Sequence, residues 1–228
     1  MSDESFFAAG SKSSLIGPSK RRESAAQVSY LWLKDRIGAV PRDAGMFISE
    51  ADVAQGSGTG RTPAREALQR LETEGYLQII PRKGIFIPPI SNADITALMD
   101  ARHVVEEWCV ERTTIGGKLS DGILGRFIDQ QERLIGEDRS FIEADRLFHR
   151  TIVTNAGNPV LSTFYEQLRD RQVRMGIMAL SRERDRALHV LTEHREIADA
   201  IQSGDAEAAR IALGKHLDTT LSVLIGGS

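Results

Sequence analysis

A glycine-rich turn that leads into an amphipathic segment is the feature that most constrains the fold of this chain. It lies in SGTGRTPAREALQRLETEGYL, at Ser57–Leu77. Pro63 suits the first turn of a helix, because the N–H that proline lacks has no partner there. Leu68 and Leu71 recur at helical spacing, and Gly75 can end the helix in a left-handed conformation. The pattern therefore predicts one helix that starts two residues before the proline.

Two further helices and a hairpin are predicted around this helix. QVSYLWLKDRI, at 27–37, has apolar residues near helical spacing. SEADVAQ offers Ser49 as an N-cap for another short helix, with Asp52 three residues further on. After the glycine, short apolar segments at 77–80 and 85–87 flank a Pro-Arg-Lys-Gly turn, which is typical of a β-hairpin. Three helices followed by a hairpin predict a winged helix-turn-helix domain.

The whole chain then divides into three parts. Residues 1–23 are rich in Ser, Gly and Lys, and we expect a flexible tail. Residues 24–88 form the winged helix-turn-helix domain, and residues 91–226 form an all-α bundle of about six helices divided by glycines. The expected helices of the bundle cover 91–116, 120–135, 141–156, 159–180, 183–202 and 206–225. The predicted fold class is therefore mainly α.

The charge distribution and the single cysteine bear on the partners and the cellular location of the chain. Residues 1–90 carry 12 Lys and Arg against 10 Asp and Glu, whereas the remainder carries 17 against 22. This weak asymmetry indicates two modules with different partners. The single cysteine, Cys109, excludes an intrachain disulfide and favours a reducing, cytoplasmic location. No segment approaches the ~20 apolar residues of a membrane span, and the N-terminus does not resemble a signal peptide.

Basic residues gather where a winged helix-turn-helix domain would meet DNA. Arg61 and Arg65 are four residues apart, so both project from one side of the predicted recognition helix near its start. A guanidinium can pair with guanine O6 and N7 together, and Thr62 could add a hydroxyl contact. The hairpin turn would bind phosphates, with a glycine that permits close approach of the backbone. The candidate residues of the hairpin turn are Arg82, Lys83 and Gly84. The alternative is an ordinary charged surface, and periodicity alone favours neither.

Four residues of the helical half carry side chains that a divalent metal accepts. Asp145 and His149 lie four residues apart, so a helix would place both on one side. His194 and His216 fall on the last two predicted helices. One carboxylate and three imidazoles suit zinc, nickel, manganese or iron. A pair at this spacing occurs often by chance, so the alternative is a set of hydrogen-bonded core histidines.

The stretch RTPAREALQRLETEGYL, with the following PRKGIFI, resembles the DNA-binding domain of the GntR family of bacterial transcription regulators. The resemblance implies that the two arginines of the predicted recognition helix read the operator and that the glycine of the wing approaches the minor groove. The chain departs from the family pattern at four positions. Ala51 replaces an arginine, and Ser57, Thr59 and Gly60 stand where leucine, valine and a capping hydroxyl are usual. These departures imply a looser turn and an altered operator.

The helical half resembles the FCD domain of the FadR-like subgroup of the same family. The resemblance lies in DARHVVEEW, in DRLFHRTIV with GNPVL, and in HREIADAIQSGDAEAARIALGKHL. It assigns metal ligation to Asp145, His149, His194 and His216, with zinc as the expected ion. A small carboxylate would complete the metal's shell, and a pocket arginine would bind its other oxygen. The resemblance gives Arg102 this role, and the further candidates are Arg150, Asn155, Arg169, Arg171 and Arg174.

These features together predict a ligand-responsive transcription regulator, most simply a repressor, and not an enzyme. It would bind a palindromic operator as a homodimer and sense a small carboxylic acid at a metal-containing pocket. One alternative is a metal-dependent hydrolase, although no general base or nucleophile motif accompanies the histidines. Another is a DNA-binding regulator whose helical domain senses a protein partner or holds a purely structural metal.

Overall fold

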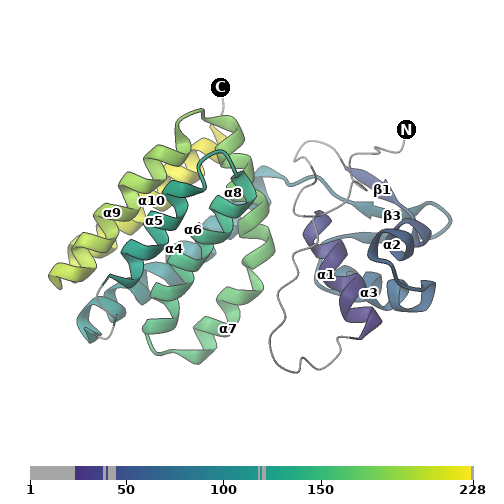
Figure 1. Cartoon of the computed structure of the whole chain (residues 1–228), viewed down its shortest axis with the longest axis horizontal. Coiled ribbons are helices and arrows are strands. Elements are labelled where there is room, and N and C mark those ends of the chain that lie inside the picture. Colours follow the sequence, from purple (N-terminus) through teal and green to yellow (C-terminus); the bar gives the residue numbers. More distant parts are fainter. Residues whose placement is uncertain (1–23, 38–39, 41–44, 118, 120–121, 227–228) are drawn as a thin grey trace. The chain divides into compact units, whose positions relative to one another are not determined.

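The computed structural model describes residues 24–37, 40, 45–117, 119 and 122–226, apart from the side chains of residues 169 and 170. The chain forms two compact units, residues 1–90 and 91–228 (Figure 1). Within the described residues it contains ten helices and three strands, so the mainly α fold class is confirmed. The tail expected at 1–23 lies outside the described residues.

The first unit is a winged helix-turn-helix domain, as predicted. Its elements are α1 (Ala25–Ile37), β1 (Met46–Ile48), α2 (Glu50–Ser57), α3 (Arg61–Thr73), β2 (Gln78–Ile80) and β3 (Gly84–Ile87). A capping box opens α2: Ser49 Oγ accepts a hydrogen bond from the Asp52 N–H at 3.1 Å, and the Asp52 carboxylate accepts from the Ser49 N–H at 2.8 Å. Gly75, two residues beyond α3, has a φ of 77°, which fits its expected role at the helix end.

The sequence pattern did not predict β1. This strand pairs antiparallel with β3, with Phe47 opposite Phe86 and Ile48 opposite Ile85, which gives the sheet order β1-β3-β2. The Phe47 and Phe86 rings contact each other, with centroids 4.8 Å apart. A strand of three residues is too short to show an alternating pattern, and Gly45 directly precedes it. Pairing with a distant strand therefore creates β1, and no local signal does.

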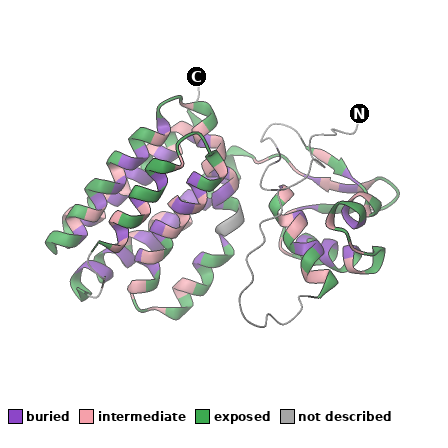
Figure 2. Cartoon of the chain, in the orientation of Figure 1, coloured by how far each residue is buried: buried purple, intermediate pink, exposed green. Residues whose placement is uncertain are grey.

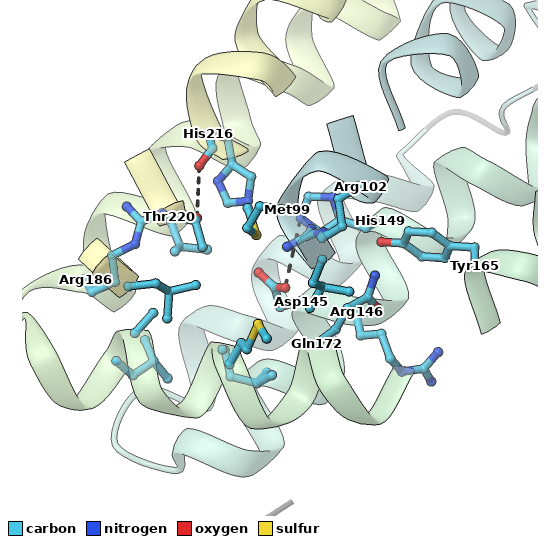
Figure 3. A pocket seen from close by; sticks show the side chains of 18 residues that line it. Met99, Arg102, Asp145, Arg146, His149, Tyr165, Gln172, Arg186, His216 and Thr220 are labelled. Atoms are coloured by element: carbon cyan, nitrogen blue, oxygen red, sulfur yellow. Dashed lines mark hydrogen bonds and ion pairs between the residues drawn. The ribbon is translucent and has the colours of Figure 1, made fainter. Parts of the chain in front are cut away.

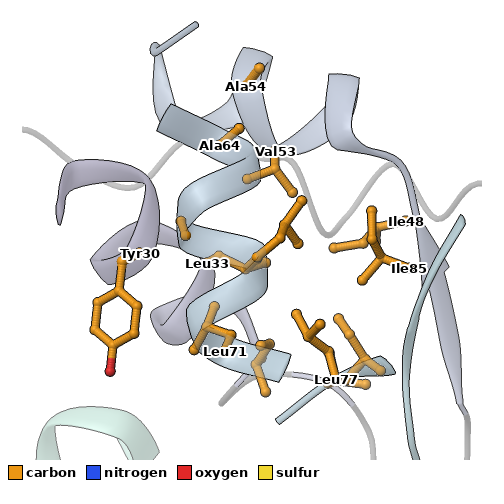
Figure 4. Close-up of a cluster of buried hydrophobic side chains, with 14 residues drawn as sticks. Tyr30, Leu33, Ile48, Val53, Ala54, Ala64, Leu71, Leu77 and Ile85 are labelled. Carbon is orange, nitrogen blue, oxygen red and sulfur yellow. The ribbon is translucent and has the colours of Figure 1, made fainter. Parts of the chain in front are cut away.

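The core of this unit lies between the helices and the sheet (Figure 4). Leu33 of α1 and Leu71 of α3 are fully buried, and Ile85 of β3 covers them from the sheet side. Burying an aliphatic side chain of this size stabilises a fold by ~1.5–3 kcal/mol. Because α3 buries a stripe that includes Ala64 and Leu68, its opposite side remains exposed. The three residues of α3 that are predicted to meet DNA, Arg61, Thr62 and Arg65, lie on that exposed side.

Three hydroxyl side chains connect α1 to the turn between α2 and α3. Thr59 Oγ1 lies 2.6 Å from Ser29 Oγ and 2.9 Å from Ser57 Oγ, and Ser57 also donates to the Val53 carbonyl at 2.6 Å. Ser29 is fully buried. Gly58 ends α2 in the left-handed conformation. The departures from the family pattern imply a looser turn, but hydrogen bonds here take the place of the apolar packing that leucine and valine would give.

Gly60 gives α3 no side-chain cap, so a substitution there is expected to stabilise the domain. It occupies the N-cap with a φ of −87°, and a Cβ would lie 3.7 Å from Pro63 Cδ, an ordinary contact. Gly60→Ser should raise the free energy of unfolding by about 0.5 kcal/mol, because it adds a cap and restricts the unfolded chain. Urea denaturation measures the change. Gly58→Ser, at a φ of 67°, is the contrasting variant and should destabilise the domain.

The second unit is an all-α bundle, and its described residues form seven helices. They are α4 (Asn92–Gly116), α5 (Ile123–Arg133), α6 (Asp138–Asn155), α7 (Pro159–Gln167), α8 (Arg169–Arg182), α9 (Arg186–Ser203) and α10 (Ala206–Ile225). A second capping box, between Ser91 and Asp94, opens α4. Helix α10 packs against α4 and α9, and α6 packs against α4, α5 and α8. Figure 2 shows buried residues along the sides of these helices that face their neighbours.

The single helix predicted over 159–180 is in fact two helices, α7 and α8, which meet at Leu168. The Leu168 N–H bonds the Tyr165 carbonyl at 3.1 Å in a tight turn, and the Leu168 carbonyl then accepts from the Gln172 N–H. No glycine or proline marks this position, so the local pattern could not show the break. Tyr165 and Gln172 both line the cavity described below, and burial of Tyr165 and Leu168 fixes the turn.

The single cysteine lies in the core of the helical unit. Cys109 is fully buried, and burial together with the nearby Glu106 raises its pKa to about 12. In the part of the chain that the structure describes, no helix combines the length and the apolar character required to cross a bilayer.

Candidate metal centre and DNA-binding surface

Four side chains from three helices converge inside the helical unit. Asp145 and His149 come from α6, His194 from α9 and His216 from α10. One possible ligand atom from each lies within 4.8 Å of all the others. His194 Nε2 lies 3.2 Å from His149 Nε2 and 3.4 Å from Asp145 Oδ1. The structure therefore brings together all four residues that the sequence analysis grouped.

Each histidine of this cluster is oriented by an oxygen next to its Nδ1 atom. The three oxygens are Glu106 Oε2 beside His149 at 2.7 Å, Gln131 Oε1 beside His194 at 2.8 Å, and Glu193 Oε2 beside His216 at 2.6 Å. Since a carboxylate or amide oxygen can only accept a hydrogen bond, these contacts favour the tautomer with hydrogen on Nδ1, which leaves Nε2 a free lone pair. The His194 ring also stacks on Phe148, with centroids 4.0 Å apart. This is the arrangement by which proteins orient metal-bound imidazoles.

The electrostatics favour the neutral forms of His194 and His216 and the charged forms of Glu106 and Glu193. Burial and the neighbouring imidazoles lower the pKa of His194 well below its usual value, and burial also lowers the pKa of His216. Burial alone would raise the pKa of Glu106, but the Arg102 guanidinium and the adjacent imidazole hold it well below its usual range. Against the same effect of burial, hydrogen bonds lower the pKa of Glu193 to about 2. Neutral nitrogen donors next to fixed anions are what a divalent cation requires.

The donor set fits a divalent metal ion. Three imidazole nitrogens and one carboxylate suit zinc, nickel, manganese or iron, and no thiolate takes part, because Cys109 is not in the cluster. The other two histidines lie elsewhere: His103 contacts Glu107 at 2.8 Å, and His189 contacts Glu183 at 2.9 Å. The four clustered residues could hold the ion, which would supply positive charge and open coordination positions.

A cavity opens beside this cluster (Figure 3). Asp145, His149 and His216 form one side of it. Tyr165 donates to Glu106 Oε1 at 2.8 Å, and Arg102 Nε donates to the same atom at 2.6 Å. The other polar lining residues are Arg146, Gln172, Arg186 and Thr220. Within the described residues, Gln172 Nε2 and Arg186 Nε are buried without a hydrogen-bond partner, so donors remain for a small molecule.

Among the effector-binding candidates from the sequence, the structure places only Arg102 in the described lining of this cavity. Arg150 follows His149 directly, which turns it about 100° around α6, and it pairs with Glu166 at the surface. Asn155 donates to the Thr151 carbonyl at 2.8 Å. Arg171 is exposed, Arg174 is half-buried outside the lining, and the side chain of Arg169 lies outside the described residues.

Two lining arginines were missed from the sequence. Arg146 lies three residues before His149, so the two share one side of α6, and this spacing is a signal that could have identified Arg146. Arg186 lies eight residues before His194, about 80° away around α9, so the spacing gives no such signal for it. Arg186 is fully buried and binds both carboxylate oxygens of Glu193, at 2.8 and 2.9 Å.

The residues predicted to read DNA are exposed at the start of α3. Arg61, Thr62 and Arg65 all lie on the solvent side of its first two turns. Arg65 makes a bidentate pair with Glu50, the first residue of α2, from Nε at 2.9 Å and from Nη2 at 3.1 Å. Arg61 has no ion pair with any described residue. The sequence pattern did not predict that Arg65 is held by an ion pair while Arg61 has none with a described residue.

The wing places its basic residues at the tip of the β2–β3 hairpin. Arg82 and Lys83 are exposed, and Arg82 has a φ of 65°, which is rare for a residue other than glycine. Gly84 has a φ of 107°, and a Cβ there would lie 3.1 Å from the Ile48 carbonyl oxygen. The fold therefore requires glycine at this position independently of any contact with DNA.

A winged helix-turn-helix domain joined to a helical domain that encloses a cavity is typical of a class of DNA-binding transcription regulators. Comparison with known families gives the same class. The family described as "Bacterial regulatory proteins, gntR family" matches residues 27–87, and the FCD domain matches residues 97–219. The chain therefore belongs to the GntR family of bacterial transcription regulators, with a C-terminal FCD domain. This family consists of regulators, so the alternative of a metal-dependent hydrolase is wrong.

Curated relatives cover most of this chain. A protein of Paenarthrobacter nicotinovorans named "Probable D-xylose utilization operon transcriptional repressor" is 30% identical over 208 residues, which is 86% of this chain and 87% of the relative. An HTH-type transcriptional regulator of Streptomyces ambofaciens is 28% identical over 191 residues, 82% of this chain and 80% of the relative. The transcriptional repressor RspR of Escherichia coli is 25% identical over 178 residues, 76% of this chain and 77% of the relative.

Solved structures show the same fold at lower identity. E. coli McbR/YncC has a TM-score of 0.74 and 22% identity, over 90% of this chain and 98% of that protein. A GntR transcriptional regulator from Rhodococcus sp. RHA1 has a TM-score of 0.72 and 23% identity, over 89% of this chain and 97% of that protein.

Proposed function

We propose that this regulator is a cytoplasmic repressor that binds a palindromic operator as a homodimer and responds to a small carboxylic acid at a metal-containing pocket. In this proposal residues 24–88 bind DNA and residues 91–226 bind the effector. The observation that carries it is the convergence of Asp145 and the three histidines beside a cavity with unused buried donors. An acid that occupies an open metal position could also bind Arg102.

Two measurements on the purified full-length chain test this proposal. Metal analysis should find one divalent ion per chain, with zinc as the proposed ion. A screen of carboxylic acids should find one that raises the melting temperature and changes the affinity for DNA. An ion that stays bound while no acid has any effect would favour a purely structural metal or a protein signal.

The orientation of His194 by Gln131 gives a prediction for the metal site. Gln131→Met removes the oxygen that accepts from His194 Nδ1 while it keeps the size of the side chain. The affinity for zinc should fall about 10- to 100-fold, as for other partners of metal-bound histidines. A competition assay with a zinc-sensitive dye measures it. Gln130→Met, at the exposed neighbouring position on α5, should leave the affinity unchanged, and equal losses in both variants would contradict the role of Gln131.

The proposed DNA contacts are Arg61, Thr62 and Arg65 on α3, with Arg82, Lys83 and Gly84 in the wing. All of these except Gly84 are exposed, and the arginines of α3 occupy the end of a recognition helix that enters the major groove. Two-fold symmetry of the dimer would match two half-sites about one helical turn apart.

Glu50 is predicted to sharpen base recognition by Arg65. The Glu50 carboxylate accepts hydrogen bonds from Nε and Nη2 of Arg65, along one edge of the guanidinium. The end of the guanidinium formed by Nη1 and Nη2 remains available for guanine. Glu50→Ala should reduce the ratio of specific to non-specific affinity about tenfold, because Arg65 loses its fixed orientation. Anisotropy titrations with a selected duplex and a shuffled duplex measure the ratio. Glu66→Ala removes the same charge from an exposed position on α3, and equal changes in both variants would show that only charge matters.

An exposed apolar stripe of the helical unit supports the proposed dimer. Val104, Trp108 and Ile115 lie on α4 with exposures of 76%, 42% and 62%, and Ile211 lies on the adjacent α10 with 56%. Large apolar side chains exposed side by side are typical of protein–protein contact. Sedimentation of the wild-type chain and of Trp108→Glu tests whether this stripe joins two copies.

A further inference from the structure

The charges that line the cavity define the class of acid that the proposed function requires. Three arginines line it, and each is already paired with a glutamate. Arg102 binds Glu106 at 2.6 Å, Arg146 binds Glu143 at 3.1 Å, and Arg186 binds Glu193 at 2.8 Å. Arg146 also lies 3.7 Å from Glu166. Among the described residues that line the cavity, every arginine therefore has a glutamate beside it.

The remaining charge lies at the metal cluster. Asp145 is the single carboxylate among the four ligands, so a divalent ion held there would leave a net charge of about +1. One carboxylate of a ligand would balance this charge. Its second oxygen could accept from Arg102, as in the proposed function, or from Gln172, which also lines the cavity. A second carboxylate of the ligand would lie close to the three arginines. Because each arginine is already paired with a glutamate, none of them would be free to balance the second negative charge.

Much of the remaining lining is apolar. Helix α8 contributes Met175, Ala179 and Leu180, and α4 contributes Leu98 and Met99, which lies beside His216 (Figure 3). These side chains offer no hydrogen bond to a hydroxyl group. They would instead favour buried hydrocarbon, at about fourfold in affinity for each methylene removed from water.

We propose that the effector is a monocarboxylic acid with a hydrocarbon body, and that dicarboxylic acids and sugar acids bind poorly. This inference rests on the proposed function, because it concerns the same cavity and metal. It makes the effector of this chain chemically different from a sugar acid, even though one relative is named for D-xylose utilization.

Calorimetric titration of the zinc-loaded full-length chain tests the inference, with acids matched in length. Affinity should rise about fourfold per methylene from butanoate to hexanoate. In adipate, a second carboxylate replaces the terminal methyl group of hexanoate. Adipate should bind at least ~100-fold more weakly than hexanoate, because burying an unpaired charge is costly. Gluconate should also bind weakly. If adipate or gluconate bound as tightly as hexanoate, the inference would be overturned while the proposed acid response stood. If no acid bound, the proposed function would fail and the inference with it.

Two sets of variants test which residues cause the preference for a hydrocarbon body and for a single carboxylate. Met175→Gln keeps the size of the side chain but adds polarity to the apolar wall, so hexanoate affinity should fall about tenfold. Leu188→Gln, at an exposed position of α9 outside the cavity, is the control. Unchanged hexanoate binding by folded, zinc-loaded Met175→Gln would count against the proposal. The comparison of acids on the wild-type chain stands even where a variant fails to fold.

The second set changes the charge balance. Replacing Glu143 and Glu166 together with glutamine would leave Arg146 without its two anions. This double variant should bind adipate at least tenfold more tightly than the wild-type chain does, with hexanoate affinity nearly unchanged. No gain for adipate would show that paired arginines are not the reason for its exclusion.

Discussion

His194→Ala should leave the purified protein without bound metal, whereas the wild-type chain should retain one ion. His194 is fully buried, and its Nε2 lies 3.2 Å from the nearest other ligand nitrogen, so no other described side chain can replace it in the cluster. The affinity for zinc should fall by more than the ~100-fold expected from loss of an orienting residue. Zinc at 100 times its Kd should stabilise the wild-type fold by about 2.7 kcal/mol and should stabilise the variant hardly at all.

Metal analysis after gel filtration and thermal melts with and without zinc measure both effects. His189→Ala is the matched control, because His189 lies on the same helix but is exposed and contacts Glu183 outside the cluster. It should behave like the wild-type chain. Full retention of metal by His194→Ala would contradict the assignment of the site.

Arg61→Ala should weaken operator binding strongly, with little effect on folding. Arg61 is exposed and has no ion pair with any described residue, so its guanidinium is available for a base. A bidentate contact between arginine and guanine is worth about 1–3 kcal/mol. Because a dimer loses the contact twice, the affinity should fall by roughly 2–6 kcal/mol, or about 30-fold to more than 10,000-fold. Arg65→Ala should have a similar effect.

Electrophoretic mobility shifts, with a duplex selected from a random pool by the wild-type protein, measure the loss. Arg195→Ala removes one positive charge from the helical unit and serves as the charge-matched control. Binding by Arg61→Ala that matched this control would mean that α3 does not read the bases.

Local signals made the DNA-binding domain predictable from the sequence. The capping box at Ser49, the proline in the first turn of α3 and the glycine that follows it act within a few residues, so the boundaries of α2 and α3 follow from the sequence. The strand β1 and the break at Leu168 depend on partners that are distant in the chain. Neither has a local residue that would force it.

The metal cluster was predictable only in part. The spacing of Asp145 and His149 places both on one side of α6, but His194 and His216 joined them through a family resemblance and not through the pattern itself. The residues that orient the histidines, Glu106 and Gln131, come from α4 and α5, and only the packing of these helices against α6, α9 and α10 brings them near. Arg150, a further effector candidate, follows His149 directly, and a helix turns adjacent residues to different sides, so it lies outside the cavity lining.

Helix α4 lines the cavity and begins next to the end of the first unit. It has 25 residues, which is about 37 Å at 1.5 Å per residue, and it begins two residues after Ile90, the last residue of the first unit. Its third and fourth turns carry Arg102 and Glu106, and the capping box at Ser91 holds its first turn in helical form. In the proposed function, a small rotation of α4 caused by an acid at the cavity would therefore reach Ser91, next to the last residue of the first unit, through the helix itself.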